Sequence, residues 1–314
     1  MMDVSIIIVS WNTRAYLKQC LESVRVANSQ CVQEVIVVDN ASADGSPEMV
    51  EKEFPEVRLI RAGSNLGFAR GNNLAMTYAR GNMFALVNSD ALVHVGCLDT
   101  LAAFLHANSE VGLVGPRVIG GDGRLQRTCR RLPGVWNTFC RTIALDRVLP
   151  NWPLFSGYEL TDRDHEVRRE VDVLSGCFCM ARREAVDAIG GLDEQFFFYG
   201  EDIDWCKRFA DAGWKVVFVP EATATHFGGG STANAPLRYS IEILRATLKY
   251  WRKHYGVGGE IVSFSLMLAH HGIRLAGRAL SQALGFGRSA YARYKVREDL
   301  ACVRWLLTGK SVQQ

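Results

Sequence analysis

Short β-branched apolar runs alternate with amphipathic segments through the first 120 residues of the sequence. The runs are VSIIIVS, EVIVVDN, VRLIRA, MFALVNSD and VGLVGPRV, and we expect each to form a strand. VSIIIVS is continuously apolar, as in a strand covered on both faces, and EVIVVDN is expected to be buried as well. Between them, apolar residues recur at helical spacing, as Leu17, Leu21 and Val24 do after the first run. Alternation at this pitch predicts an α/β fold built on a doubly wound, mostly parallel sheet.

The rest of the chain shows two further patterns. Residues from about 120 to 170 are less regular and contain the basic cluster RLQRTCRR. A compact block follows, with strands predicted at VDVLSGCFCMARR and KVVFVP, helices at REAVDAIGG and GEDIDWCKRFADAG, and a loop at ATATHFGGGS. After Pro236 the spacing becomes helical and predicts helices over 237–256, 260–284 and 288–307.

Charge is distributed unevenly along the chain. The net charge is +3, but residues 236–314 hold 13 Lys and Arg against 4 Asp and Glu, so the preceding part is mildly acidic. A basic tail on an acidic body favours contact with an anionic surface, either nucleic acid or phospholipid.

Cysteine usage and hydropathy indicate the compartment. The nine cysteines are scattered without CxxC or zinc spacing, which favours reduced thiols in the cytosol. The N-terminal MMDVSIIIVSWN lacks the basic start of a signal peptide, and no apolar stretch reaches the roughly 18 residues that span a bilayer. We therefore expect a cytoplasmic protein that does not cross a membrane but could touch one from the cytoplasmic side.

Two common nucleotide-binding motifs are absent from the sequence. There is no GxxxxGK[ST] phosphate loop, and SWNTRAYL, which follows the first strand, has no glycine of a GxGxxG fingerprint. A doubly wound sheet binds ligands beyond the carboxyl ends of its strands. Polar residues gather at those ends, in SWN, DNASADGS and NSD.

Two aspartates stand at predicted strand ends. Asp39 could accept a hydrogen bond from the imide of uracil or thymine, or it could simply form an Asx turn. Asp90 could hold a divalent cation, because Mg²⁺ takes one or two protein carboxylates and completes its shell with phosphates and waters.

Two later motifs carry further candidate residues. In YGEDIDWCKR, three acids stand at a helix N-terminus, where they either complement the helix dipole or supply a general base such as Asp202. In THFGGGS, His226 precedes three glycines and is either an ordinary packed histidine or a metal ligand beside a loop able to close over a diphosphate.

Six spaced elements, SIIIVSWN, VVDNASADGS, NLGFARGNN, LVNSDA, GEDIDWCKR and HFGGGST, together resemble the family 2 glycosyltransferases, which have the GT-A fold. The similarity covers about residues 4 to 232. Within the family, NLGFARGNN and GEDIDWC are most similar to bacterial rhamnosyltransferases of polysaccharide and cell-wall assembly.

The resemblance implies a set of donor-binding residues. Asp39 would recognise the nucleotide base with Asn40 beside it, and Asn65, Gly67 and Asn73 would line the donor pocket. The donor would be a nucleotide sugar, with dTDP-rhamnose the best specific guess and a UDP-hexose the alternative.

The resemblance also implies the chemistry. Asp90 and His226 would bind Mg²⁺ or Mn²⁺ on the donor diphosphate, and Asp202 would take the proton from an acceptor hydroxyl. One displacement then inverts the anomeric configuration. Two departures from the family pattern are Asn88, where relatives often have aspartate, and Asn72, where many have an arginine.

The implied organisation is a GT-A domain over 1–235, with a donor half to about 120 and an acceptor half to 235, and a basic amphipathic helical extension over 236–314. The extension would either lie on an anionic membrane or pack on the body. Lipid contact would imply a lipid-linked saccharide acceptor rather than a soluble saccharide. A catalytically silent nucleotide-sugar binder would be expected to have lost one of its acids. A nucleic-acid-binding protein would use the basic tail, but no nucleic-acid module is recognised.

Overall fold

The computed structural model describes residues 3–149, 152, 154–155, 165–229, 236–284 and 289–310. The chain divides into two compact units. The first contains Met1–Leu132 and Arg163–Ser231, and the second contains Pro133–Asp162 and Thr232–Gln314.

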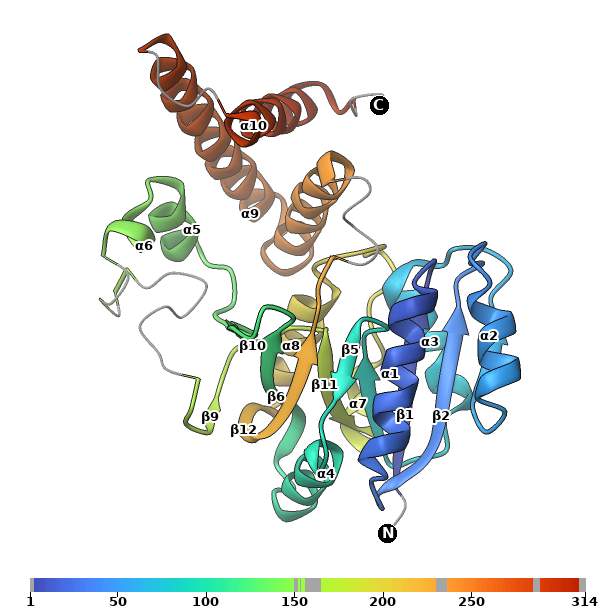
Figure 1. Cartoon of the computed structure of the whole chain (residues 1–314). Coiled ribbons are helices and arrows are strands. Elements are labelled where there is room, and N and C mark those ends of the chain that lie inside the picture. Colours follow the sequence, from blue (N-terminus) through green and yellow to red (C-terminus); the bar gives the residue numbers. More distant parts are fainter. Residues whose placement is uncertain are drawn as a thin grey trace. The chain divides into compact units, whose positions relative to one another are not determined.

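A mostly parallel sheet forms the centre of the first unit, with ten strands in the described part of the chain (Figure 1). Its main order is β3-β2-β1-β4-β11-β6-β12-β5. The parallel pairs are β1–β2, β2–β3, β1–β4 and β6–β12, whereas β11 and β5 run antiparallel to their neighbours. The eight strands are β1 (Val4–Ser10), β2 (Val32–Asp39), β3 (Arg58–Arg61), β4 (Met83–Val87), β5 (Ala91–Val93), β6 (Val111–Gly120), β11 (Phe178–Arg182) and β12 (Lys215–His226).

Short strands and six helices complete this unit. β7 (Leu125–Gln126) pairs with β6, β9 (Arg169–Glu170) pairs with β12, and β8 (Cys129–Arg130) pairs with β10 (Val173–Leu174). The helices are α1 (Arg14–Ala27), α2 (Ser46–Glu53), α3 (Gly67–Tyr78), α4 (Cys97–Ala107), α7 (Arg183–Ile189) and α8 (Glu201–Asp211). This arrangement is the predicted α/β, GT-A-like fold.

Both faces of the first strand are buried, as its continuous apolar run predicts. Ile6 and Ile8 pack into a core with Leu17 of α1 and Leu101 of α4. Val9 lies on the other face, where α3 approaches so closely that a Cβ on Gly71 would lie 2.9 Å from Val9 Cγ1. Because helices cover both faces, a ligand would reach the sheet at the carboxyl ends of its strands.

Three predicted strand boundaries differ from the observed ones. The strand predicted over 83–90 ends at Val87, and the chain turns before β5 begins at Ala91. The strand predicted at VDVLSGCFCMARR is broken at 175–177, between β10 and β11. The predicted loop at ATATH is instead the end of β12, which resumes its pairing with β6 after an irregularity between Val219 and Thr223.

The second unit is helical where it is described. It contains α5 (Val135–Thr142), α6 (Leu145–Val148), α9 (Pro236–Ala283) and α10 (Ala290–Thr308). Gly256 has φ +66° and interrupts α9, near where two separate helices were predicted to meet. Ile241, Leu244, Met267 and Trp305 form the centre of its core. In the described ranges, no helix is both long and apolar enough to span a bilayer.

Candidate active site

Strand pairing brings His226 to Asp90. His226 is the last residue of β12 and pairs with Ala91, the first residue of β5. The Phe227 N–H donates to the Asp90 carbonyl at 3.0 Å. As a result, His226 Nε2 lies 3.2 Å from Asp90 Oδ1, with both side chains largely buried.

A second residue fixes the ring of His226. Its Nδ1 lies 3.0 Å from the side-chain oxygen of Gln126, whose amide group donates to the His226 carbonyl at 2.7 Å. Because the Gln126 oxygen only accepts, Nδ1 carries the hydrogen, and the lone pair of a neutral ring is on Nε2. Asn88 Nδ2 lies 3.3 Å from that Nε2. Histidines that bind metals are commonly oriented in this way. No local pattern in the sequence points to Gln126.

The pair of Asp90 and His226 suits a divalent cation. Neighbouring ligands of an octahedral ion with bonds of about 2.1 Å are roughly 3 Å apart, close to the observed separation. Across the described residues there is no group of three or more His, Cys, Asp and Glu side chains that could hold a metal ion. Among the described residues, Asp90 and His226 are the candidate ligands, a carboxylate oxygen that suits Mg²⁺ or Mn²⁺ and an imidazole nitrogen that suits Mn²⁺ better than Mg²⁺.

Asp39 ends β2 and is 3% exposed. Its Oδ2 accepts the Ser42 N–H at 3.0 Å, so the Asx turn is formed. Its Oδ1 is buried and has no hydrogen-bond partner in the described part of the chain. A buried carboxylate oxygen without a donor is costly unless a ligand supplies one, so this atom is available to a ligand N–H.

The other predicted donor residues hold the start of α3. Asn40 donates to the Gly67 carbonyl at 3.0 Å, and Asn65 accepts the Gly67 N–H at 2.9 Å. Gly67 has φ +80°, and a Cβ there would lie 2.5 Å from the Phe197 carbonyl oxygen, so only glycine fits.

Asn73 joins α3 to the loop before α8. Its Nδ2 donates to the Leu192 carbonyl at 2.8 Å, and its Oδ1 accepts the Leu192 N–H at 2.9 Å. Arg70 pairs with Glu194 of the same loop at 3.3 Å. Asn73 and Arg70 of NLGFARGNN therefore contact the loop that leads to Asp202.

Asp202 lies in the first turn of α8, after Gly200 with φ +86°. Its Oδ2 accepts the Gly176 N–H at 3.2 Å, and its Oδ1 accepts the Ile203 N–H at 2.9 Å. The neighbouring Glu201 is 7% exposed. Burial, followed by the charge of Asp202, raises the pKa of Glu201 to about 8. Glu201 is therefore mostly protonated at neutral pH.

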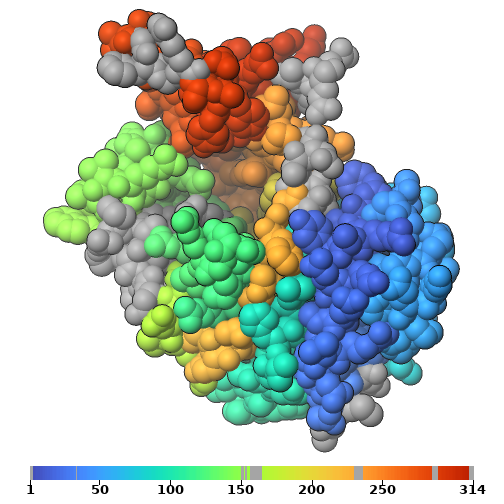
Figure 2. Space-filling model, in the orientation of Figure 1, coloured from blue at the N-terminus to red at the C-terminus, as the bar shows by residue number. Residues whose placement is uncertain are grey.

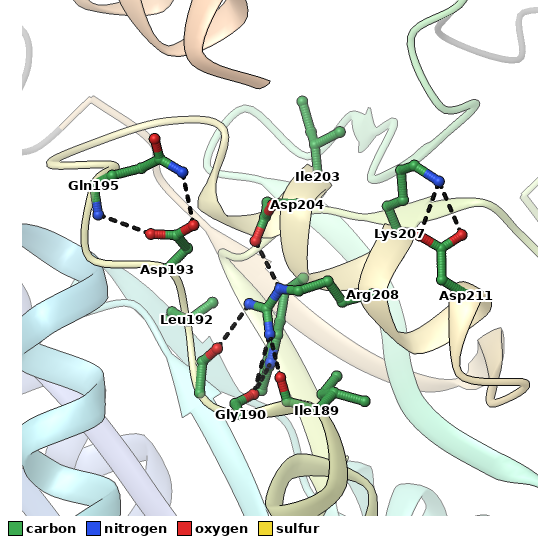
Figure 3. A network of polar contacts seen from close by, with 12 residues as sticks. Ile189, Gly190, Leu192, Asp193, Gln195, Ile203, Asp204, Lys207, Arg208 and Asp211 are labelled. Carbon is green, nitrogen blue, oxygen red and sulfur yellow. Dashed lines mark hydrogen bonds and ion pairs between the residues drawn. The ribbon is translucent and has the colours of Figure 1, made fainter. Parts of the chain in front are cut away.

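Asp204, the third acid of this motif, has a structural role (Figure 3). It is fully buried, and its Oδ2 accepts from Arg208 Nε at 2.8 Å. The same guanidinium donates to the carbonyls of Ile189 and Gly191 at 2.9 and 2.7 Å. Asp204 therefore orients an arginine that ties α8 to the end of α7.

The break between β10 and β11 is close to both Asp90, the candidate metal ligand, and Asp202, the candidate base. The Asn88 N–H donates to the Cys177 carbonyl at 3.0 Å, and the preceding residue, Gly176, donates to Asp202. Burial raises the pKa of the Cys177 thiol to about 11, and the charges of both Asp90 and Asp202 also raise it. Both carboxylates are thus close to the same short turn.

The chain belongs to glycosyl transferase family 2, whose family profile matches residues 5–190. A second profile, the N-terminal domain of galactosyltransferase, matches residues 160–228.

Individual relatives agree with this assignment. The N-acetylglucosaminyl-diphospho-decaprenol L-rhamnosyltransferase of Mycobacterium tuberculosis is 29% identical over 243 residues, which covers 74% of this chain and 78% of that protein. The low-salt glycan biosynthesis hexosyltransferase Agl10 of Haloferax volcanii is 25% identical, over 66% of this chain and 61% of that protein.

Solved structures share the fold. A mannosyltransferase from Pyrobaculum calidifontis, in complex with GDP-Man and Mn²⁺, has a TM-score of 0.61 at 17% identity, over 98% of this chain and 88% of that one. Glucosyl-3-phosphoglycerate synthase from Mycobacterium tuberculosis, in complex with Mn²⁺ and UDP, has a TM-score of 0.52 at 16% identity, over 79% of each chain.

Proposed function

We propose that this glycosyltransferase is inverting and metal-dependent, and that it transfers L-rhamnose from dTDP-rhamnose to a saccharide or lipid-linked saccharide. The observation that carries the proposal is that Asp90 and Asp202 are both close to the turn at 175–177, since the charges of both act on Cys177. The rhamnosyl donor and the lipid-linked acceptor are supported by the name of the mycobacterial relative.

Donor recognition depends on Asp39 in this proposal. The buried Oδ1 accepts the imide N–H that thymine and uracil both present. A UDP-hexose therefore remains the second candidate donor. Asn40, Asn65, Gly67 and Asn73 act by holding α3 and the loop before α8 in place around the donor.

Asp90 and His226 would hold Mg²⁺ or Mn²⁺ against the donor diphosphate. When bound, such an ion stabilises the negative charge that develops on the departing nucleoside diphosphate. The protein would supply the Asp90 carboxylate and the lone pair on Nε2 of His226, which lie 3.2 Å apart. Gln126 contacts Nδ1 of the same ring and so keeps that lone pair directed toward Asp90.

Asp202 acts as the general base. It removes the proton from an acceptor hydroxyl, whose oxygen forms the new bond to the anomeric carbon while the bond from that carbon to the diphosphate oxygen breaks. The adjacent Glu201 is mostly protonated at neutral pH, so it adds little negative charge beside the base. These catalytic roles argue against the alternative of a catalytically silent nucleotide-sugar binder.

A lipid-linked acceptor would place the enzyme at the cytoplasmic face of a membrane, in peripheral contact with it. The predicted contact through residues 236–314 depends on aromatic residues interleaved with Arg and Lys, among them Trp251, Tyr255, Phe286, Tyr291 and Trp305. Two of those aromatics, Trp251 and Trp305, are 2% and 9% exposed. Another, Phe286, lies outside the described residues. Tyr255 and Tyr291, which are 45% and 71% exposed, are members of that set that remain open to a membrane.

A donor screen tests the proposal. The full chain is incubated with dTDP-rhamnose, UDP-glucose, UDP-galactose or GDP-mannose and a polyprenyl-diphospho-N-acetylglucosamine, with and without Mn²⁺, and free nucleoside diphosphate is measured. We expect Mn²⁺-dependent release with dTDP-rhamnose above the others and a product of inverted configuration. Preference for a UDP-hexose would support the second candidate, and no release from any donor with metal would contradict both.

A further inference from the structure

Three buried hydroxyl groups form a chain between the end of β1 and the turn after β4. The hydroxyl groups of Ser10 and Thr13 are hydrogen-bonded at 3.0 Å, and the Thr13 hydroxyl donates to the Ser89 hydroxyl oxygen at 2.9 Å. Ser10 is fully buried, and Thr13 and Ser89 are 4% and 7% exposed. At such positions a hydroxyl hydrogen normally has an acceptor.

The direction of this chain follows from the number of hydrogens. A hydroxyl group carries one hydrogen and two lone pairs. Because Thr13 gives its hydrogen to Ser89, the bond between Ser10 and Thr13 is donated by Ser10. Ser89 therefore receives a hydrogen from Thr13 and keeps its own. Within the described ranges, the Ser89 hydroxyl donates to no protein acceptor.

Thr13 joins the chain in place of an ordinary helix cap. It is the N-cap residue of α1, where a threonine hydroxyl commonly accepts an N–H from the first turn of the helix. Its side chain makes no such bond and is bound to Ser10 and Ser89 instead. The stability of α1 alone therefore does not explain the chain.

The hydroxyl chain lies between the two ends of the proposed donor site. Ser10 is the last residue of β1 and pairs with Asp39 at the end of β2. In the sheet, β1 lies between β2 and β4, and Ser89 stands beside Asp90 in the turn after β4. A nucleotide whose base binds Asp39 and whose diphosphate reaches Asp90 therefore passes the end of β1, where the chain ends at Ser89.

The buried hydroxyls lie just beneath the surface. Asn12 and Arg14, the neighbours of Thr13 on either side, are both exposed. Figure 2 shows the dark blue residues of α1 at the surface of the first unit. A ligand can therefore approach the start of this helix from solvent.

We propose that Ser89 is a binding residue for the donor nucleotide and that its hydroxyl donates to an oxygen in the middle of that nucleotide. Two oxygens of dTDP fit this description, the 3′-oxygen of the deoxyribose and an oxygen of the α-phosphate. Thr13 and Ser10 are positioning residues, because their hydrogens orient Ser89 so that its own hydrogen faces away from Thr13. This role rests on the proposed function, in which the nucleotide binds between Asp39 and Asp90.

Calorimetry with dTDP tests the proposal, with no acceptor present and both with and without Mn²⁺. We expect Ser89→Ala to bind dTDP roughly 2- to 12-fold more weakly than the parent chain, as for one neutral hydrogen bond, and more weakly still if the partner is a phosphate. The loss should be the same with and without Mn²⁺, because the hydroxyl contacts the nucleotide. Affinity equal to the parent overturns the proposal. A loss seen only with Mn²⁺ also overturns it, since the variant would then act through Asp90.

Variants of Thr13 test the positioning role separately. Thr13→Val keeps the shape of the side chain but removes the hydroxyl that orients Ser89, so affinity for dTDP should fall. Thr13→Ser keeps the hydroxyl and should bind like the parent. The matched control is Thr142→Val, which removes another buried hydroxyl, one that donates to the Thr138 carbonyl in α5. The control should bind dTDP like the parent. Equal affinity in Thr13→Val and Thr13→Ser would contradict the positioning role, and circular dichroism melting shows whether each variant is folded.

A second ligand identifies the oxygen. With 3′-deoxythymidine diphosphate, the difference between the parent chain and Ser89→Ala should vanish if the 3′-oxygen is the partner and persist if a phosphate oxygen is. Either result supports the proposal. Binding of dTDP that Ser89→Ala leaves unchanged would remove this inference and leave the proposed function standing. A parent chain that binds neither dTDP nor UDP would contradict the proposed function itself.

Discussion

Nε2 of His226 lies 3.2 Å from Oδ1 of Asp90, at the point where the end of β12 meets the start of β5. The two residues are 136 positions apart in the sequence, and backbone pairing brings them together. Gln126 fixes the imidazole from the other side. This arrangement makes the metal-binding part of the proposed mechanism directly testable.

Removing the carboxylate of Asp90 should abolish the effect of metal on donor binding. We expect Mn²⁺ to leave the affinity of Asp90→Ala for dTDP unchanged, because His226 alone would bind the ion too weakly. Isothermal titration calorimetry in both conditions measures this. The control is Asp122→Asn, which removes an exposed acid. An undiminished Mn²⁺ response in Asp90→Ala would exclude this residue as a ligand.

Loss of the general base should reduce turnover and spare donor affinity. Asp202→Asn keeps the size of the side chain but cannot take a proton, so we expect kcat to fall roughly 10²–10⁴-fold. Asp211→Asn, at the other end of the same helix, should leave kcat unchanged. Steady-state kinetics and calorimetry with dTDP separate the two effects. Turnover at the parent rate in Asp202→Asn would assign the base elsewhere.

The base-recognition role of Asp39 predicts a selective loss of nucleotide affinity. Asp39→Asn places a donor or a weaker acceptor where the imide N–H would bind. A hydrogen bond to a charged group is worth about 1.5–3 kcal/mol, so affinity for dTDP and UDP should fall roughly 10- to 100-fold. Inorganic pyrophosphate, which has no base, should bind both proteins equally. Equal loss for pyrophosphate would mean that the variant disturbs the whole site.

The buried pair of Asp204 and Arg208 predicts a large effect on stability. Asp204→Asn leaves the guanidinium of Arg208, which is 18% exposed, without its fully buried carboxylate partner. Breaking a fully buried pair costs about 3–5 kcal/mol in proteins, so we expect a loss toward the lower end of that range. Lys207 and Asp211 form an i,i+4 pair on the same helix, with Asp211 57% exposed, so Lys207→Met should cost less than about 1 kcal/mol. Urea unfolding of the two variants compares them. Similar losses in both would show that Asp204 is not a structural anchor.

Glu201 predicts a pH dependence of stability. Its pKa is raised to about 8 in the folded chain, above its ordinary 4.5, so the folded state holds the proton more tightly. The stability from this group is fully present below about pH 4.5 and is lost as the pH rises through about 8. Glu201→Gln should remove this component, flattening the fall in Tm between pH 5 and 8.5. A parent and variant with parallel Tm profiles would contradict it.

The sequence predicted the carboxyl edge of the sheet well. Asp39 and Asp90 follow apolar runs, and parallel strands bring their ends to one edge whatever the details of packing. The alternation of strands and helices likewise predicted the fold class, because runs such as VSIIIVS and MFALV are buried within the sheet.

Other parts of the site depend on contacts that no local pattern records. Both Asp202 and Asp204 stand in the first turn of the helix predicted from GEDID, so either could be the base on that pattern alone. In the structure Asp204 binds Arg208, which also contacts the end of α7, and Asp204 therefore has a structural role. The break before β11 was hidden in a run that reads as one strand. Gln126 had no signal at all, since its role depends on where β12 ends.

The account centres on a cation at Asp90 and His226 that shares one donor site with Asp202. Anomalous diffraction from crystals grown with Mn²⁺ and dTDP locates that ion directly. We predict a manganese peak within bonding distance of Asp90 and His226, on the diphosphate, with Asp202 no farther away than one hexose would span. A manganese ion bound to the diphosphate but away from Asp90, or an Asp202 carboxylate beyond the reach of any sugar, would contradict the account.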